Sequence, residues 1–136
     1  MKSLVILYSY TGYTKSIAKE LATKEAANIA EIKDTKRPGV IKAYTAGCIA
    51  ALRGKAWPIQ PLGAVLADCD RLILLAPIWA GNPAPAFNAV LELLPKGKSV
   101  AVKMVSGSGK SECKERLDMA IQAKGCTLES FEDIKA

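Results

Sequence analysis

The sequence predicts an α/β fold in which helices cover a five-stranded parallel sheet, in three layers. Short apolar runs alternate with helical patterns along the 136 residues, as in strands joined by right-handed helical crossovers. One run, residues 71–77, is apolar on both of its alternating faces, as a central parallel strand covered on both sides requires. The length suits a single domain spanning residues 1–136.

The strands are predicted where apolar runs lie between turn residues. The first run leads into a hydroxyl-rich turn, and the second ends before Pro38 and Gly39, which interrupt regular secondary structure. The fourth run leads into the loop that starts at Ser106, and the fifth follows Gly125. We expect these strands at residues 4–8, 28–33, 71–77, 99–105 and 126–132.

The helices are predicted where apolar residues recur every three or four positions. Residues 14–27 form the first helical pattern, residues 40–52 the second, and residues 62–67 a turn or short helix. Asn82 is expected to cap the next helix, with Pro83 and Pro85 in its first turn. Its buried stripe is Phe87, Val90, Leu91 and Leu94, and the stripe of the last helix is Cys113, Leu117, Ala120 and Ile121.

The turn after the first strand has the composition of an anion-binding loop. It leads directly into a helix, whose N-terminus offers unpaired N–H groups and a partial positive charge. Ser9, Thr11 and Thr14 add hydroxyl groups, and Gly12 allows the backbone to approach a ligand closely. No Lys or Arg lies within residues 9–14, so amides and hydroxyls would hold a phosphate there.

Two motifs together resemble the flavodoxin family, whose members bind FMN. S-x-T-G-x-T at residues 9–14 looks like the family's phosphate loop, and residues 75–91 look like its flavin-ring loop and following helix. The resemblance implies FMN as cofactor and three cofactor-binding loops. Loop 1 is Ser9, Tyr10, Thr11, Gly12, Tyr13 and Thr14; loop 2 is Pro77, Ile78, Trp79, Ala80, Gly81 and Asn82; loop 3 is Ser106, Gly107, Ser108 and Gly109.

The resemblance also implies a role for particular residues. Trp79 is expected to stack on the flavin ring, and Gly81 lies where a peptide can flip toward the reduced flavin. Asn82 is expected either to contact the ring or to cap its helix. Loop 3 has no aromatic residue, although the family often stacks one there. Trp57, Tyr10 and Tyr13 are the substitutes that the sequence offers.

The family further implies the strand order 2-1-3-4-5 and one more helix after the fifth strand. This sequence has no residues for that helix, so one face of strands three to five is expected to be partly bare. Lys103 in the fourth strand fits this expectation, because a charge inside a doubly covered strand is costly. Either a second copy covers that face in a homodimer, or the bare area is simply small.

The four cysteines show no C-x-x-C spacing and the chain contains no histidine, so no metal site is predicted. We expect packed, reduced thiols. No apolar run reaches the length of a membrane span, and the N-terminal run is too short for a signal peptide. The sequence therefore favours a cytoplasmic protein that has no membrane partner.

The net charge is +6, and basic residues gather in one segment opposed only by Asp34. Such a segment is either a solvated surface or a docking face for an acidic protein or an anionic reductant such as NAD(P)H. Nucleic-acid binding is not expected, because no aromatic residues interleave and no recognised module is present. The basic residues of this segment are Lys33, Lys36, Arg37, Lys42, Arg53 and Lys55.

Other functions of this architecture lack their key residues. Residues 106–111 look briefly like a Walker A loop, but Met104 stands where that motif needs Gly. A receiver domain needs acidic residues after the first strand, and a low-mass tyrosine phosphatase needs Cys and Arg there. Three readings remain: an FMN electron carrier, an NAD(P)H-dependent quinone or flavin reductase, and a non-redox interaction domain that has lost flavin.

Overall fold

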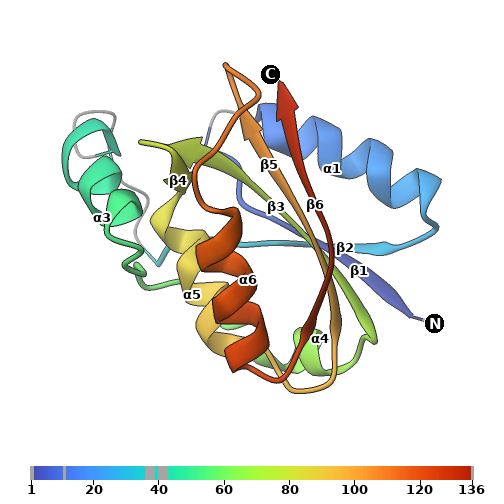
Figure 1. Cartoon of the computed structure of the whole chain (residues 1–136). Coiled ribbons are helices and arrows are strands. Elements are labelled where there is room, and N and C mark those ends of the chain that lie inside the picture. Colours follow the sequence, from blue (N-terminus) through green and yellow to red (C-terminus); the bar gives the residue numbers. More distant parts are fainter. Residues whose placement is uncertain (1, 11, 36–38, 40–42, 136) are drawn as a thin grey trace.

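Five long parallel strands form the centre of the molecule (Figure 1). The structure is a computed structural model, and it describes residues 2–10, 12–35, 39 and 43–135. The long strands are β1 Ser3–Leu7, β2 Asn28–Glu31, β3 Arg71–Trp79, β5 Ser99–Ser106 and β6 Thr127–Lys135. Their order, β2-β1-β3-β5-β6, confirms the predicted order of the five parallel strands.

The sheet also contains a sixth, very short strand that the sequence analysis did not predict. This strand, β4 Asn82–Pro83, pairs antiparallel with the end of β3. The turn between the two strands contains only Ala80 and Gly81, which have φ values of 52° and 80°. Positive φ at both central residues is the pattern of a type I′ hairpin turn. The prediction of a purely parallel, five-stranded sheet was therefore wrong at this position.

The helices follow the predicted alternation with the strands. They are α1 Tyr13–Lys24, the π-helix η1 Ala43–Gly47 with α3 Cys48–Leu52, α4 Gly63–Ala67, α5 Pro85–Leu93 and α6 Lys114–Ala123. The first helix ends earlier than predicted, and Ala26 beyond it has a φ of 51°. Residues 40–42 of the second predicted helix lie outside the described residues. Among the residues described, no helix is long and apolar enough to span a membrane.

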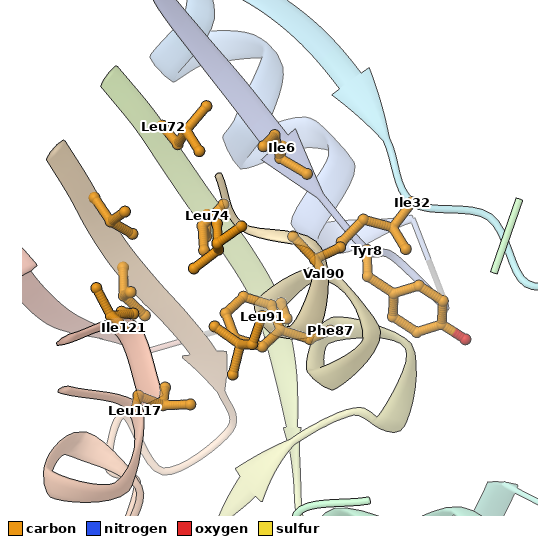
Figure 2. Packing of buried hydrophobic residues seen from close by; sticks show 14 of the residues in the cluster. Ile6, Tyr8, Ile32, Leu72, Leu74, Phe87, Val90, Leu91, Leu117 and Ile121 are labelled. Carbon is orange, nitrogen blue, oxygen red and sulfur yellow. The ribbon is translucent and has the colours of Figure 1, made fainter. Parts of the chain in front are cut away.

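The larger hydrophobic core lies between the sheet and α4, α5 and α6 (Figure 1). Figure 2 shows Phe87 and Leu91 of α5 on the side of that helix that faces β3, and both belong to this core together with Leu74 and Val90. The side chain of Phe87 is 0% exposed. The stripe predicted for this helix is therefore confirmed, and α6 adds Leu117 and Ile121 to the same core.

The opposite face of the sheet carries α1 and a smaller core. Val5, Leu7, Ile73 and Leu75 pack there with Ala18 of α1. Both faces of β1 and β3 are thus covered, as the continuous apolar run at residues 71–77 predicted. Because both faces of these strands are covered, the β1 and β3 carboxyl ends are held in fixed positions at one edge of the sheet.

Beyond α1, the same face of β3, β5 and β6 is polar. The Arg71 guanidinium forms three hydrogen bonds to Glu129, two of 2.9 Å and one of 2.6 Å, and one of 3.2 Å to Glu25. The Ser99 hydroxyl donates to Glu129 over 2.7 Å. Lys103 pairs more loosely with Glu132, at 3.5 Å. The face that we expected to be bare therefore carries a network of paired charges rather than exposed apolar side chains.

We expect Glu129→Gln to lower the free energy of unfolding at pH 7 by about 1 kcal/mol, the upper range for a pair near the surface. The hydrogen bonds from Arg71, followed by that from Ser99, lower the pKa of Glu129. The stabilisation is thus present above the ordinary glutamate pKa of about 4.3 and is lost as the pH falls through the lowered value. Urea unfolding from pH 7 to pH 3 measures this difference.

Glu132→Gln is the matched control, because the Glu132 side chain is 58% exposed and its pair with Lys103 is longer. We expect this control to change stability less than Glu129→Gln does. A destabilisation by Glu129→Gln that stayed constant down to pH 3 would contradict the charge network, because the stabilisation declines below the ordinary glutamate pKa of about 4.3.

Candidate functional site

The three predicted loops lie at the same edge of the sheet, where β1, β3 and β5 end (Figure 1). Parallel strands present their carboxyl ends at one edge, and open α/β sheets bind ligands there. Two observations join the loops. Tyr10 in loop 1 contacts Trp79 in loop 2, with ring centroids 5.7 Å apart. The segment after loop 3 bonds to loop 2, because the Glu112 N–H donates to the Gly81 carbonyl over 2.9 Å.

Loop 1 bends around Gly12, the N-cap residue of α1. Gly12 has a φ of 98°, a left-handed conformation that an L side chain adopts at a cost. A Cβ atom built on Gly12 would meet nothing within 4 Å. The Gly12 N–H donates to the Ser9 hydroxyl over 2.9 Å, which closes the bend. The space beside Gly12, where α1 begins, is therefore open.

The other loop 1 residues differ in their surroundings. Thr14 is 3% exposed, so its side chain faces the interior rather than solvent. Tyr13 is 48% exposed, and Tyr10 is half-buried against the larger core. Thr11 lies outside the described residues. Of the three predicted hydroxyl groups, only Ser9 is thus placed at the open bend by the described structure.

Loop 2 is the β3–β4 hairpin, which corrects the predicted role of Asn82. The N-cap residue of α5 is Ala84, and Asn82 lies in β4 instead. The Asn82 amide donates to the Ala80 carbonyl over 3.3 Å, so this side chain stabilises the hairpin turn. Of the two prolines predicted in the first helical turn, Pro83 lies in β4 and Pro85 is the first helical residue.

Loops 2 and 3 enclose a cavity of about 550 Å³, within the usual size range of small-molecule sites. Glu112 extends across its wall, because a Cβ atom on Gly81 would lie 3.2 Å from the Glu112 carboxylate. Several lining residues of loop 3 are exposed, so the cavity opens to solvent. The lining residues are Ile78, Ala80, Gly81, Ser106, Gly107, Ser108, Lys110, Ser111 and Glu112.

The shape of loop 3 is set by its own hydroxyl groups. The Ser106 hydroxyl accepts from the Gly109 N–H over 3.0 Å, and the Ser108 hydroxyl accepts from the Lys110 N–H over 3.3 Å. Gly109 lies against β6, since a Cβ atom there would be 3.0 Å from that of Lys135. Ser111 adds a hydrogen bond of 2.6 Å to Asp133 on β6. These contacts fix loop 3 beside the last strand.

Trp79 lies in an aromatic cluster rather than in the wall of the cavity. It makes edge-to-face contacts with Tyr8, Tyr10 and Trp57 at centroid distances of 6.3, 5.7 and 6.3 Å. Gly47 of η1 packs on the indole so closely that a Cβ atom would lie 2.8 Å from it. The cluster therefore ties loop 1, loop 2 and the 43–57 segment together. Trp79 remains half-buried.

A second, smaller hollow of about 250 Å³ lies where β1 and β2 end. Tyr8, Ser9 and Tyr10 line one side, and residues 31–34 with Gln60 line the other. The Tyr8 hydroxyl donates to Asp34 over 2.6 Å. Tyr10 also touches Trp79, the neighbour in sequence of Ile78 and Ala80 in the larger cavity. The aromatic cluster therefore connects a residue that lines the smaller hollow to the strand end that lines the larger cavity.

Arg116 is a half-buried cation beside loop 2 that the sequence analysis missed. Its guanidinium donates to the side-chain oxygens of Asn82 and Asn88, both over 3.5 Å. A signal for it exists in the sequence: Arg116 occupies a position within the apolar stripe of its helix, between Cys113 and Ala120. A charged residue on such a stripe indicates a buried polar contact.

Cysteine chemistry is not favoured near the site. Burial raises the pKa of the Cys113 thiol, outweighing the hydrogen bond from Ser111 and the charge of Arg116, which lower it. Cys69, Cys113 and Cys126 are buried and Cys48 is half-buried, in agreement with the predicted packed thiols. Within the described part of the chain, no group of three or more His, Cys, Asp or Glu residues could hold a metal ion.

Comparison with solved structures shows that the fold is flavodoxin-like. A flavoprotein from Lactobacillus acidophilus, solved in complex with FMN, is 19% identical with a TM-score of 0.77, over 96% of this chain and 91% of that one. The two-electron reduced flavodoxin of Megasphaera elsdenii is 17% identical with a TM-score of 0.63, over 97% and 87%. Oxidised flavodoxin 1 of Bacillus cereus is 19% identical with a TM-score of 0.59, over 100% and 86%.

At the level of sequence, no family model and no curated protein matches this chain. The structural similarities nevertheless confirm the fold that the two motifs predicted. They concern the arrangement of the backbone alone, because fewer than a quarter of the residues are identical. The chemistry of the site therefore has to be argued from the loops described above.

Proposed function

We propose that this protein binds FMN at the carboxyl edge of the sheet and transfers electrons through it. One observation carries the proposal: the open N-terminus of α1 and a cavity of about 550 Å³ lie at the edge where three loops of a flavodoxin-like fold meet. The first offers amides to a phosphate, and the second has the size and polar lining of a small-molecule site. An FMN-bound flavoprotein shares the fold.

Loop 1 would hold the phosphate. Gly12 begins α1 with a left-handed φ, and the space beside it is open. The first N–H groups of α1, which have no partner within a helix, would donate to a phosphate bound there. The Ser9 hydroxyl, which now accepts from the Gly12 N–H, can rotate to donate to a phosphate oxygen. Lys15, the third residue of α1, pairs with Glu31 at 3.2 Å, so the amides contribute most of the interaction.

Loops 2 and 3 would hold the flavin ring. Bound flavin supplies the redox chemistry, accepting and releasing electrons. The protein's part is to orient the ring between Ile78 and Ala80 on one side and loop 3 on the other, and to set the local charge. Trp79 would help to hold the ring in two ways: the edge of its indole would contact the ring, and the aromatic cluster would keep loop 2 in position. Stacking of its indole on the ring remains a prediction.

An electron carrier is favoured over a reductase, because the cavity opens to solvent along loop 3. A ring placed there would expose an edge to another protein. The basic residues Lys33, Arg53 and Lys55 are exposed and support an acidic redox partner or NAD(P)H as reductant. We infer a reducing, cytoplasmic setting from the three buried, unpaired thiols.

Anaerobic mixing of the FMN-loaded protein with NADPH separates carrier from reductase. We expect the flavin absorbance to bleach slowly over minutes with NADPH and at once with dithionite. We also expect no sustained NADPH oxidation when a quinone is added. Rapid bleaching together with steady quinone turnover would instead assign the protein to the NAD(P)H-dependent reductases.

The homodimer expected on the face of β3, β5 and β6 stays a prediction without structural support. The paired charges of Arg71, Glu129, Lys103 and Glu132 occupy that face. Charges already paired within one chain offer little to an identical copy. Sedimentation of the protein at micromolar concentrations measures its oligomeric state directly.

A further inference from the structure

In the described part of the chain, no acidic side chain forms an ion pair with Arg116. Its two hydrogen bonds go to the neutral amides of Asn82 and Asn88 and are long, at 3.5 Å. Its Nε atom is buried and has no hydrogen-bond partner. Burying this part of a half-buried cation without a partner costs free energy.

The backbone offers Arg116 partial compensation. The guanidinium lies over Gly54, where a Cβ atom would come within 2.9 Å of Nη1. Gly54 follows the C-terminus of the continuous η1–α3 helical segment, which carries a partial negative charge. The partial negative charge at the helix end offsets part of the cost of placing the guanidinium there. It amounts to about half an elementary charge and so does not neutralise the full positive charge of Arg116. A positive potential therefore remains around the guanidinium.

That potential lies directly behind the proposed ring site. Arg116 bonds to Asn82, and Asn82 follows Gly81, which lines the cavity between loops 2 and 3. The path from the cation to the cavity wall crosses one side chain and one peptide. The medium along this path is buried, since Asn82 is 8% exposed, so solvent screens the charge weakly.

We propose that Arg116 is a built-in counter-charge that stabilises the reduced, anionic flavin at loop 2. This proposal rests on the function proposed above. Two electrons and one proton added to oxidised flavin leave one negative charge on the ring. A nearby cation that belongs to none of the described ion pairs favours this form over the neutral oxidised form. The protein thereby becomes a milder reductant than it would be without Arg116.

A purely structural role would have different consequences. Arg116 could serve only to orient Asn82, whose amide in turn bonds to the Ala80 carbonyl. In that case its loss would loosen the hairpin and weaken the binding of oxidised and reduced flavin alike. A counter-charge instead changes the ratio of the two affinities, and this ratio is what a reduction potential measures.

The test compares the potential for adding the last electron in four FMN-loaded proteins, measured by dye-equilibrated anaerobic reduction. Arg116→Gln removes the charge and keeps a donor for Asn82. Asn88→Asp leaves Arg116 in place and neutralises it with a carboxylate on α5. Lys114→Gln is the matched control, because it removes an exposed positive charge from the first turn of the same helix. The wild-type protein is the reference.

We expect Arg116→Gln and Asn88→Asp each to weaken the binding of fully reduced flavin about tenfold relative to flavin that is one electron less reduced. The potential for adding the last electron then becomes more negative by about 59 mV. We expect Lys114→Gln to change this ratio less than threefold. Since Asn88→Asp retains the arginine, a folding failure of Arg116→Gln leaves the test intact. Unchanged potentials in proteins that bind FMN would overturn the counter-charge alone. A wild-type protein that binds no FMN would overturn the proposed function as well.

Discussion

Gly12→Asp is expected to weaken FMN binding at least about 100-fold, or roughly 3 kcal/mol. The new carboxylate would stand at the N-terminus of α1, in the space that a phosphate needs. Two negative charges would then compete for the same amides. The left-handed φ of 98° adds a backbone cost for any L side chain. Fluorescence titration of the apo-protein with FMN measures the change.

Gly97→Asp is the control that separates these two causes. Gly97 also has a left-handed φ, of 78°, and a Cβ atom there likewise meets nothing within 4 Å. It lies just before β5, at the amino end of the strands and away from loop 1. We expect this variant to lose some stability and to bind FMN as the wild type does. If both variants bound FMN with equal affinity, loop 1 would not be part of the FMN site.

Phe87→Ala is expected to lower the free energy of unfolding by about 3–5 kcal/mol, the usual range for deleting a buried phenyl ring. The Phe87 ring lies in the centre of the larger core, between α5 and the sheet (Figure 2). Its removal leaves a cavity that the surrounding strands cannot fill, because they are held on both faces. The midpoint of urea unfolding of the apo-protein measures this loss.

Leu93→Ala is the matched control for this prediction. Leu93 lies on the same helix, and 45% of it is exposed, so we expect a loss of less than about 1.5 kcal/mol. If both variants unfolded at the same urea concentration, α5 would not pack on the sheet as described.

The central strands could be predicted from the sequence because a strand buried on both faces is a continuous run of apolar residues. Residues 71–77 read as a central strand, and both sides of that strand are covered by the two cores. The order of the five long strands came from the family resemblance instead, since no pattern within the sequence encodes which strands are neighbours. Strand ends were predicted less well, and β6 is longer than expected.

The sequence predicted which loops lie at the candidate site, but it did not predict the contacts that their side chains make. Asn82 has the sequence context of a helix cap, yet the Ala80–Gly81 turn folds it back onto β3. Ala80 gives no signal for a left-handed turn, because such turns usually use Asn, Asp or Gly. The contact of Trp79 with Trp57 likewise joins residues that are distant in sequence. A contact of this kind cannot be predicted from a single sequence.

The most direct test of the account is a titration of the purified apo-protein with FMN, followed by absorbance and flavin fluorescence. The account predicts a yellow complex with one FMN per chain, formed at micromolar concentrations or below. It also predicts that inorganic phosphate competes for the bend at residues 9–14 and weakens this binding. A colourless protein whose spectrum does not change with micromolar FMN would contradict the central claim.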